Sequence, residues 1–117
     1  MLRTSNARII GNTISNNTGD GIGIFRLSQA DIASNTIDNN GGDGIEVSTN
    51  SGIQLGEDAL STFFDQPNTT TTYNVGYGIR CALGAYLNGH LGSSNQINGT
   101  MGQTSISSTC PNNLVTP

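Results

Sequence analysis

Residues 7–55 read ARIIGNTISNNTGDGIGIFRLSQADIASNTIDNNGGDGIEVSTNSGIQL, and this stretch contains nearly the same words twice. IIGNTISNN at 9–17 returns as IASNTIDNN at 32–40, and DGIGI at 20–24 returns as DGIEV at 43–47, each 23 positions later (32 − 9 and 43 − 20). Adding 23 again predicts that Ile53, Leu55 and Leu60 continue the apolar columns of a third repeat. A fixed period in the twenties indicates a solenoid, whose repeats bury their apolar side by stacking.

The two halves of each repeat indicate strands. Ile22 and Ile24, like Ile45 and Val47, are β-branched residues two positions apart, which suits a strand with one buried face. Between such pairs lie runs of Asn, Gly and Asp that favour turns. Because no segment has a capped helical periodicity, the sequence predicts an all-β, right-handed parallel β-helix of three to four coils of about 23 residues.

The repeated words N-x-I (12–14 and 35–37) and G-D-G-I (19–22 and 42–45), together with the lap length, resemble the parallel β-helix repeats of the pectin-lyase-like superfamily. The resemblance is closest over residues 7–60 and concerns architecture. It implies that the chain is a C-terminal piece of such a solenoid, with further coils upstream.

We expect a single β-helix domain over residues 1–117. Gly78-Ile79-Arg80-Cys81 matches residues 44–47 at an offset of 34, which is 23 plus an insertion of 11. The Asn-Gly pairs at 88–89 and 98–99 predict hairpins. The expected parts are a lead-in at 1–6, coils at 7–81 with an insertion within 61–76, an irregular cap at 82–110, and a tail at 111–117.

The two cysteines, Cys81 and Cys110, have no histidine nearby in a metal-ligand pattern. We therefore predict a disulfide between them, which ties the cap across the end of the core. A disulfide implies an oxidising compartment, so we expect the protein to be extracellular or at the cell surface.

Stacked polar residues offer the first candidate site. Asn12 and Asn35 are expected one lap apart, about 4.8 Å, with their amides hydrogen-bonded. Asp20 and Asp43 stack in the same way, and two carboxylates so close either share a proton or hold a cation such as Ca²⁺. The simpler interpretation, which we favour, is that each aspartate caps its own turn, because Ca²⁺ requires more ligands than two aspartates provide.

A possible ligand surface comes from outward residues and from the insertion. The insertion contains three of the six aromatic residues, and Phe63 and Phe64 are expected to fold back over a sheet rather than to bind a sugar. Arg26 and Arg80 are expected two laps apart on roughly the same side, with Glu46 between them in sequence, and a row of surface ion pairs explains this arrangement. The candidate ligand surface comprises Phe25, Arg26, Glu46, Phe63, Phe64 and Tyr73.

Charge and hydropathy exclude two classes of partner. The net charge is −4 and the four basic residues are all arginine, so no basic stripe exists for nucleic acid. No apolar run approaches the length of a membrane span.

Catalytic residues are also expected to be missing. The superfamily's lyases use Ca²⁺-bound carboxylates with an arginine or lysine base, and its galacturonan hydrolases use paired aspartates with a G-H-G word. This chain has no lysine and no adjacent aspartates, and Gly89-His90-Leu91 is its nearest approach to G-H-G. We predict a non-catalytic structural, adhesive or glycan-binding module, with polysaccharide as a possible partner. The alternative is a fragment of a polysaccharide lyase or glycoside hydrolase whose catalytic coils lie upstream.

The N-terminal end of the core predicts an association. Residues 1–6 are short and polar, so the apolar column of the first coil would meet water. We expect either a homo-oligomer formed through the N-terminal coil or a longer parent chain that continues the helix.

Overall fold

The computed structural model describes residues 4–56, 68–90 and 112–115. Its described strands are short, and turns of Gly, Asn and Ser separate them. The strands are β1 (Asn6–Ile10), β2 (Thr13–Ser15), β3 (Ile22–Ile24), β4 (Gln29–Ala33), β5 (Thr36–Asp38), β6 (Ile45–Ser48), β7 (Gly52–Leu55), β8 (Ile79–Ala82), β9 (Tyr86–His90) and β10 (Asn112–Val115).

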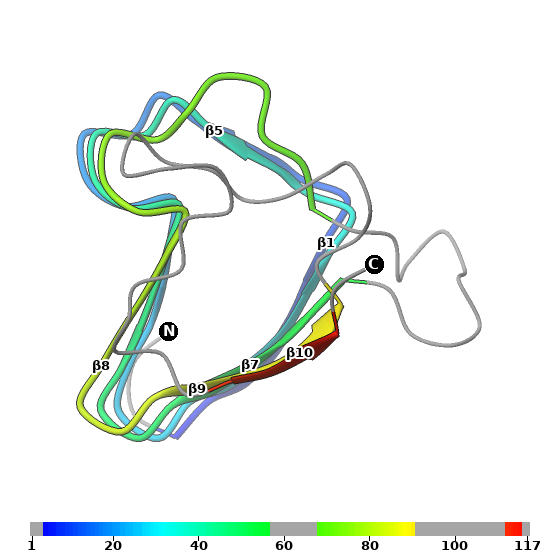
Figure 1. The fold of residues 1–117 in the computed structure, drawn as a ribbon, viewed down its shortest axis with the longest axis vertical. Helices are drawn as coiled ribbons and strands as arrows, with labels where there is room; N and C mark the ends of the chain where they lie inside the picture. Colours follow the sequence, from blue (N-terminus) through cyan, green and yellow to red (C-terminus); the bar gives the residue numbers. More distant parts are fainter. Residues whose placement is uncertain (1–3, 57–67, 91–111, 116–117) are drawn as a thin grey trace.

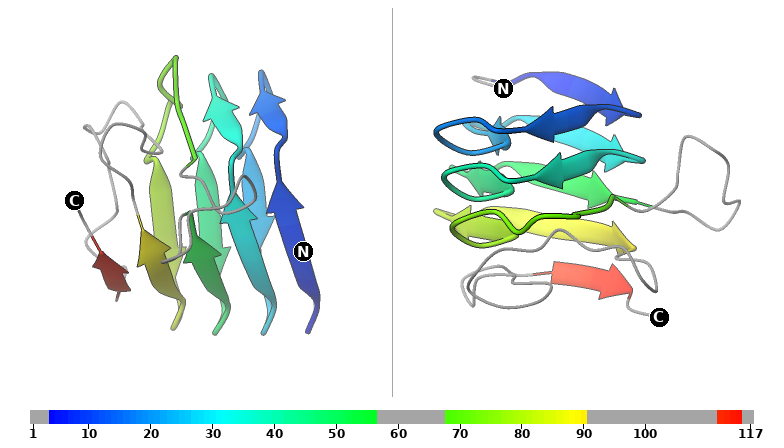
Figure 2. Two further views of the ribbon diagram at one scale, coloured as in Figure 1. Left: turned by 90° about the vertical axis from the view of Figure 1, so that its right-hand side faces the viewer. Right: turned by 90° about the horizontal axis from the view of Figure 1, so that it is seen from above.

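The strands form three parallel sheets. Their orders are β1-β4-β7-β9-β10, β2-β5 and β3-β6-β8, so each strand lies beside its counterpart from the neighbouring lap. Seen along the stacking axis, the coils superpose (Figure 1). Seen from the side, they form a stack with β1 near one end and β10 at the other (Figure 2). This arrangement is the predicted parallel β-helix.

Register follows the repeat in the sequence. Ala7 pairs with Ala30 and Ile22 pairs with Ile45, 23 positions apart in both cases. After the insertion the offset becomes 34, as in the pairing of Ile45 with Ile79. Because the offset is constant along each pair of strands, apolar side chains stack in columns.

The core is a set of inward columns. Four core positions of the second coil are completely buried, and Ile24, Val47 and Cys81 form one continuous column, as predicted. In the first coil, Ile9 and Ile14 are only partly buried, because the described residues cover them from the second coil alone. The four buried positions of the second coil are Ile32, Ile37, Ile45 and Val47.

The insertion divides into two parts. The Asn35 amide donates to Asn68, 33 residues on, whereas the Asn40 amide donates to Asn74, 34 residues on. Ten of the eleven extra residues therefore precede Asn68, and one lies between Asn68 and Asn74.

The third-coil position beside Ile37, which the 23-residue repeat assigned to Leu60, is taken by other residues. Thr70 Oγ1 donates to Ile37 O at 3.0 Å, and Thr36 bridges Thr69. Threonines therefore occupy the positions beside β5, because most of the insertion comes before them. Leu60 itself lies outside the described residues, as do Phe63 and Phe64.

The hairpin predicted at Asn88-Gly89 was also wrong. Both residues lie within β9, which pairs in parallel with β7 and β10, so regular stacking continues to His90 rather than ending at Cys81. Gly89 has φ +110°, and a Cβ there would come within 2.1 Å of Leu55 O. The glycine is thus needed for a close approach between strands, not for a reversal of the chain. The second predicted hairpin, at 98–99, lies outside the described residues.

Candidate ligand-binding surfaces

An asparagine ladder runs along the corner between the β1-β4 sheet and the β2-β5 sheet. Asn12 Nδ2 donates to Asn35 Oδ1 at 3.1 Å, and Asn35 Nδ2 donates to Asn68 Oδ1 at 2.9 Å. Asn35 Nδ2 also donates to Ile9 O at 2.7 Å. The predicted stacking of Asn12 and Asn35 is confirmed, and the ladder continues to Asn68, which sequence reasoning missed because the insertion shifts the register.

A second ladder, also missed, consists of Asn17, Asn40 and Asn74. Asn17 Nδ2 and Asn40 Nδ2 each donate to the next asparagine Oδ1 at 2.9 Å, and Asn40 and Asn74 are completely buried. The sequence contained the signal for this ladder, since Asn17 and Asn40 are 23 positions apart.

A third polar column is made of serines. Ser28 N–H donates to Ser51 Oγ at 3.2 Å, and Ser5 N–H donates to Ser28 Oγ at 3.3 Å. Among the described residues, no buried side-chain nitrogen or oxygen lacks a hydrogen-bond partner. These ladders therefore stabilise the corners of the coils and leave the outer faces of the sheets as candidate surfaces.

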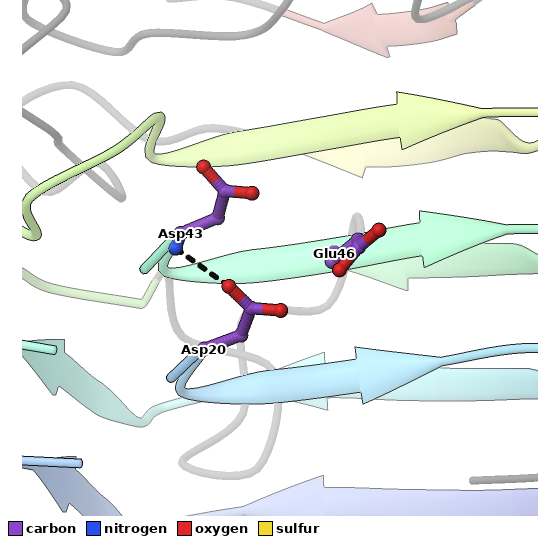
Figure 3. A group of neighbouring side chains, drawn as sticks. All are labelled: Asp20, Asp43 and Glu46. Carbon is purple, nitrogen blue, oxygen red and sulfur yellow. Dashed lines mark hydrogen bonds between the residues drawn. The ribbon is translucent and has the colours of Figure 1, made fainter. Parts of the chain in front are cut away.

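The first such surface lies outside β3-β6-β8. Asp20, Asp43 and Glu46 each bring one carboxylate oxygen within 4.8 Å of the others, and we call them the acidic trio. The two aspartates lie where successive strands begin, and Glu46 projects from β6 (Figure 3). Sequence reasoning placed Asp20 beside Asp43 but did not bring Glu46 to them.

The aspartates cap the next lap rather than their own turns. Asp20 Oδ1 accepts a hydrogen bond from Asp43 N–H, and Asp43 Oδ1 accepts one from Tyr77 N–H, both at 2.7 Å. The structure thus corrects the interpretation that each aspartate caps its own turn: a parallel coil brings the next lap's N–H closer than the local ones.

Burial raises the pKa of the Asp43 carboxyl, and the Asp20 charge adds to the rise, while the Tyr77 N–H and Arg80 oppose it. Burial also raises the pKa of Glu46, assisted by its hydrogen bond with Asp20 and by the charges of both aspartates. Arg80 Nη1 lies 3.9 Å from Asp43 Oδ2 and offsets part of the negative charge. A raised pKa favours a proton shared within the trio.

The trio alone is an incomplete Ca²⁺ site. Calcium takes about six to eight oxygen ligands, whereas the cluster supplies three carboxylates. Two of their oxygens also accept backbone hydrogen bonds, and Arg80 lies beside Asp43.

The described residues of the predicted ligand surface lie at several places. Glu46 pairs in register with Gly23 and Arg80, so Arg26 does not belong to the Glu46–Arg80 column. Arg26 instead lies in the turn after β3 with φ +57°. The Phe25 ring covers Gly23, where a Cβ would come within 2.6 Å of the ring. Tyr73 is 40% exposed in the segment that contains the single extra residue.

The second surface is a groove of about 520 Å³ on the outer face of the β1-β4-β7-β9 strands. We call it the amide groove, after the side chains of Gln29, Gln54 and Asn88 that line it together with Tyr86. Arg8 and Asp31 line it as an ion pair, with 3.5 Å between Nε and Oδ2.

Tyr86 is held across this face. A Cβ on Gly52 would come within 2.3 Å of the Tyr86 ring, so the ring lies directly over the glycine. Gln29 Nε2 donates to the Tyr86 hydroxyl at 2.9 Å, and the side chain remains 37% exposed. Sequence reasoning missed this surface because its outward positions change identity from lap to lap.

The described fold and the chain's repeats define a class, the right-handed parallel β-helices. The family described as "Right handed beta helix region" matches residues 1–116, so the chain belongs to that family. No curated protein and no solved structure matches the chain. In the part of the chain that the structure describes, there is no helix with the length and apolar character needed to cross a membrane.

Proposed function

We propose that this β-helix is a non-catalytic binding module of an extracellular or cell-surface protein, which presents its rigid outer faces to glycans. The observation that carries the proposal is that structural polar residues lie at the buried corners, whereas a different set of polar and aromatic residues lies on an outer face. The asparagine and serine ladders hold the coils in register, while amide, hydroxyl and aromatic groups line a groove on one flat outer face. Rigid elements of this kind preorganise a binding surface at little entropic cost.

The test is retention on polysaccharides. The protein is incubated with insoluble cellulose, xylan, mannan and chitin, and the bound fraction is measured against an unrelated acidic protein of similar size. Specific retention on at least one polysaccharide supports a glycan-binding module. Retention no greater than that of the acidic control on all four contradicts it.

The cap and the compartment belong to the same proposal. Cys81 is 1% exposed in an inward column, while Cys110 lies outside the described residues, so the disulfide stays a prediction. Together with three to four coils, the bridge would complete a disulfide-tied module suited to an oxidising compartment. Thiol titration of unfolded, unreduced protein should find no reactive thiol, and two thiols would contradict the bridge.

We also propose that the first coil is covered by a second copy of the chain or by upstream coils. Ile9 and Ile14 are partly exposed, whereas Ile32 and Ile37 are completely buried. Asn12 Nδ2 donates to Ile10 O of the same coil at 3.1 Å, whereas the equivalent Asn35 Nδ2 donates to Ile9 O of the preceding coil. Sedimentation equilibrium of this chain should show self-association. A monomer at micromolar concentration would exclude the second copy.

The alternative is a fragment of a carbohydrate-active enzyme, and the acidic trio is the observation that favours it. Raised carboxyl pKa values beside an arginine are typical of acid–base sites. Incubation with polygalacturonate, with and without Ca²⁺, tests this alternative through new reducing ends or unsaturated products. Turnover that Glu46→Gln abolishes would replace the binding-module proposal.

A further inference from the structure

The amide groove crosses the strands rather than following one of them. Its lining comes from β1, β4, β7 and β9, four neighbouring strands of one sheet. Successive strands are about 4.8 Å apart, so the lining side chains span about 14 Å along the stacking axis. A ligand in this groove therefore meets outward side chains of successive laps, which suits a chain of repeated units. The volume of about 520 Å³ is that of a small-molecule site.

Tyr86 provides a fixed aromatic platform. One part of its ring covers Gly52, and the hydroxyl is fixed by Gln29 from two laps away. The ring therefore keeps its position without a ligand, and its exposed part loses little entropy on binding. The negative face of an aromatic ring attracts the weakly positive C–H groups on one face of a pyranose.

The polar lining complements hydroxyl groups. Gln54 and Asn88 are paired in register on β7 and β9, beside the ring of Tyr86. An amide side chain offers two N–H donors and a carbonyl acceptor, and a sugar hydroxyl both donates and accepts. Side-chain amides beside an aromatic ring therefore match a ligand rich in hydroxyls.

The charge in the groove favours a neutral ligand. Arg8 and Asp31 are the only ionisable residues besides Tyr86 in the described part of the lining, and they form an ion pair, so their charges largely cancel. The chain as a whole carries a net charge of −4, which disfavours polyanions at long range. A neutral polysaccharide meets neither repulsion nor a buried unpaired charge.

A peptide fits this face less well. Extended peptides add to a sheet edge through backbone hydrogen bonds, but backbone groups on this face already pair β4 with β1 and β7. Among the described residues that line the groove, Tyr86 is the only large side chain with apolar surface at an outward position, so this lining offers no second apolar site for an alternating peptide side chain.

We propose that the amide groove binds a neutral polysaccharide chain, which lies across β4, β7 and β9 with one sugar ring packed on Tyr86. This inference rests on the proposed glycan-binding function and adds the site, the orientation of the chain and the class of sugar. The acidic trio, on a different sheet, takes no part in this binding.

The test is isothermal titration of the purified chain with cellohexaose, xylohexaose and mannohexaose, with hexagalacturonate as the acidic probe. At least one neutral hexasaccharide should bind, and more tightly than hexagalacturonate. Tyr86→Ala should weaken that binding by about tenfold or more, the loss of one stacking contact. Tyr86→Phe keeps the ring and should lose less, while Val75→Ala, at an exposed apolar residue outside the groove, should bind as the wild type does.

The outcomes separate the site from the function. If a folded Tyr86→Ala variant bound with full affinity, the amide groove would not be the binding site, and glycans would bind to another face. Absence of binding to all four hexasaccharides would overturn the groove, and the proposed function falls as well if the insoluble polysaccharides also fail to retain the protein. Tighter binding of hexagalacturonate than of the neutral hexasaccharides would contradict the preference for a neutral ligand. Binding of a fluorescent alternating Tyr-Ser peptide that Tyr86→Ala abolishes, without saccharide binding, would assign the groove to a protein partner instead.

Discussion

Two sheets of the same β-helix each carry an aromatic ring over a glycine, yet their surroundings differ. On the five-stranded sheet, Tyr86 lies over Gly52 among amides and a compensated ion pair. On the three-stranded sheet, Phe25 lies over Gly23, and the neighbouring outward positions carry Glu46 and Arg80. An aromatic ring thus covers a bare glycine on each sheet, but only the first ring belongs to the groove lined by amides.

The difference shows how a β-helix separates structure from recognition. Inward columns are constrained because each apolar side chain packs on the laps above and below it. Outward positions have no such constraint, so one face became polar and nearly neutral while the other gathered three carboxylates.

The largest expected effect is on stability, because a variant that destabilises the coils affects both outer faces at once. Asn35→Ala removes the side-chain hydrogen bonds of Asn35 with Asn12 N–H, Ile9 O and Asn68 Oδ1, although the Asn35 backbone N–H still donates to Asn68 Oδ1. Each unmet buried group is costly, so we expect a loss of about 2–4 kcal/mol in the free energy of unfolding, measured by urea denaturation. Asn12→Ala, at the exposed end of the same ladder, should cost less than about 1 kcal/mol. Equal losses would show that the ladder does not stabilise the coil through its buried rung.

A matched pair of glycine variants contrasts the two faces directly. Gly52→Ala places a Cβ within 2.3 Å of the Tyr86 ring, and Gly23→Ala places one within 2.6 Å of the Phe25 ring. In both cases the ring can swing away, so both variants should fold. We expect Gly52→Ala to weaken binding of the neutral hexasaccharide by about tenfold, because the platform moves. Gly23→Ala should bind as the wild type does, and the reverse pattern would assign binding to the three-stranded face.

The smallest effect concerns the acidic trio. The folded-state pKa of Glu46 is raised above its ordinary value of 4.5, chiefly by burial. A raised carboxyl pKa means that the folded state binds the proton more tightly, so this contribution to stability is present below pH 4.5 and is lost as the pH rises through the folded-state pKa. Glu46→Gln should therefore be more stable than the wild type at neutral pH, by about 0.5 kcal/mol for a partly exposed group.

The measurement is thermal unfolding of both proteins from acidic to neutral pH. The difference between them should vanish at low pH, where the wild-type carboxyl is protonated and resembles the amide. Parallel profiles, with one constant difference throughout, would show that Glu46 does not titrate abnormally.

Repetition decided what the sequence could predict. The apolar columns, Asn12 over Asn35 and Asp20 beside Asp43 all follow from identical or similar residues 23 positions apart. Strand β9 was mistaken for part of a hairpin because Ala85 stands where Ser51 does, and Gly89 where Leu55 does, so the repeated words vanish while the backbone register persists.

The outward residues of the amide groove do not repeat in the sequence, so the sequence did not predict the groove. Its outward column reads Asn6, Gln29, Gly52 and Tyr86, four different residues, and the last one comes after the insertion that shifts the register. Only the three-dimensional register places Tyr86 over Gly52 and within reach of Gln29.

The most direct test of the glycan groove is a map of amide chemical shifts, recorded while the neutral hexasaccharide that binds the chain best is titrated into the isotope-labelled protein. We predict saturable shifts at Gly52, Gln54 and Tyr86 and at the side-chain amide of Gln29, with the signals of Glu46 and Arg80 unchanged. Shifts confined to β6 and β8, with the β4-β7-β9 face unchanged, would contradict the account.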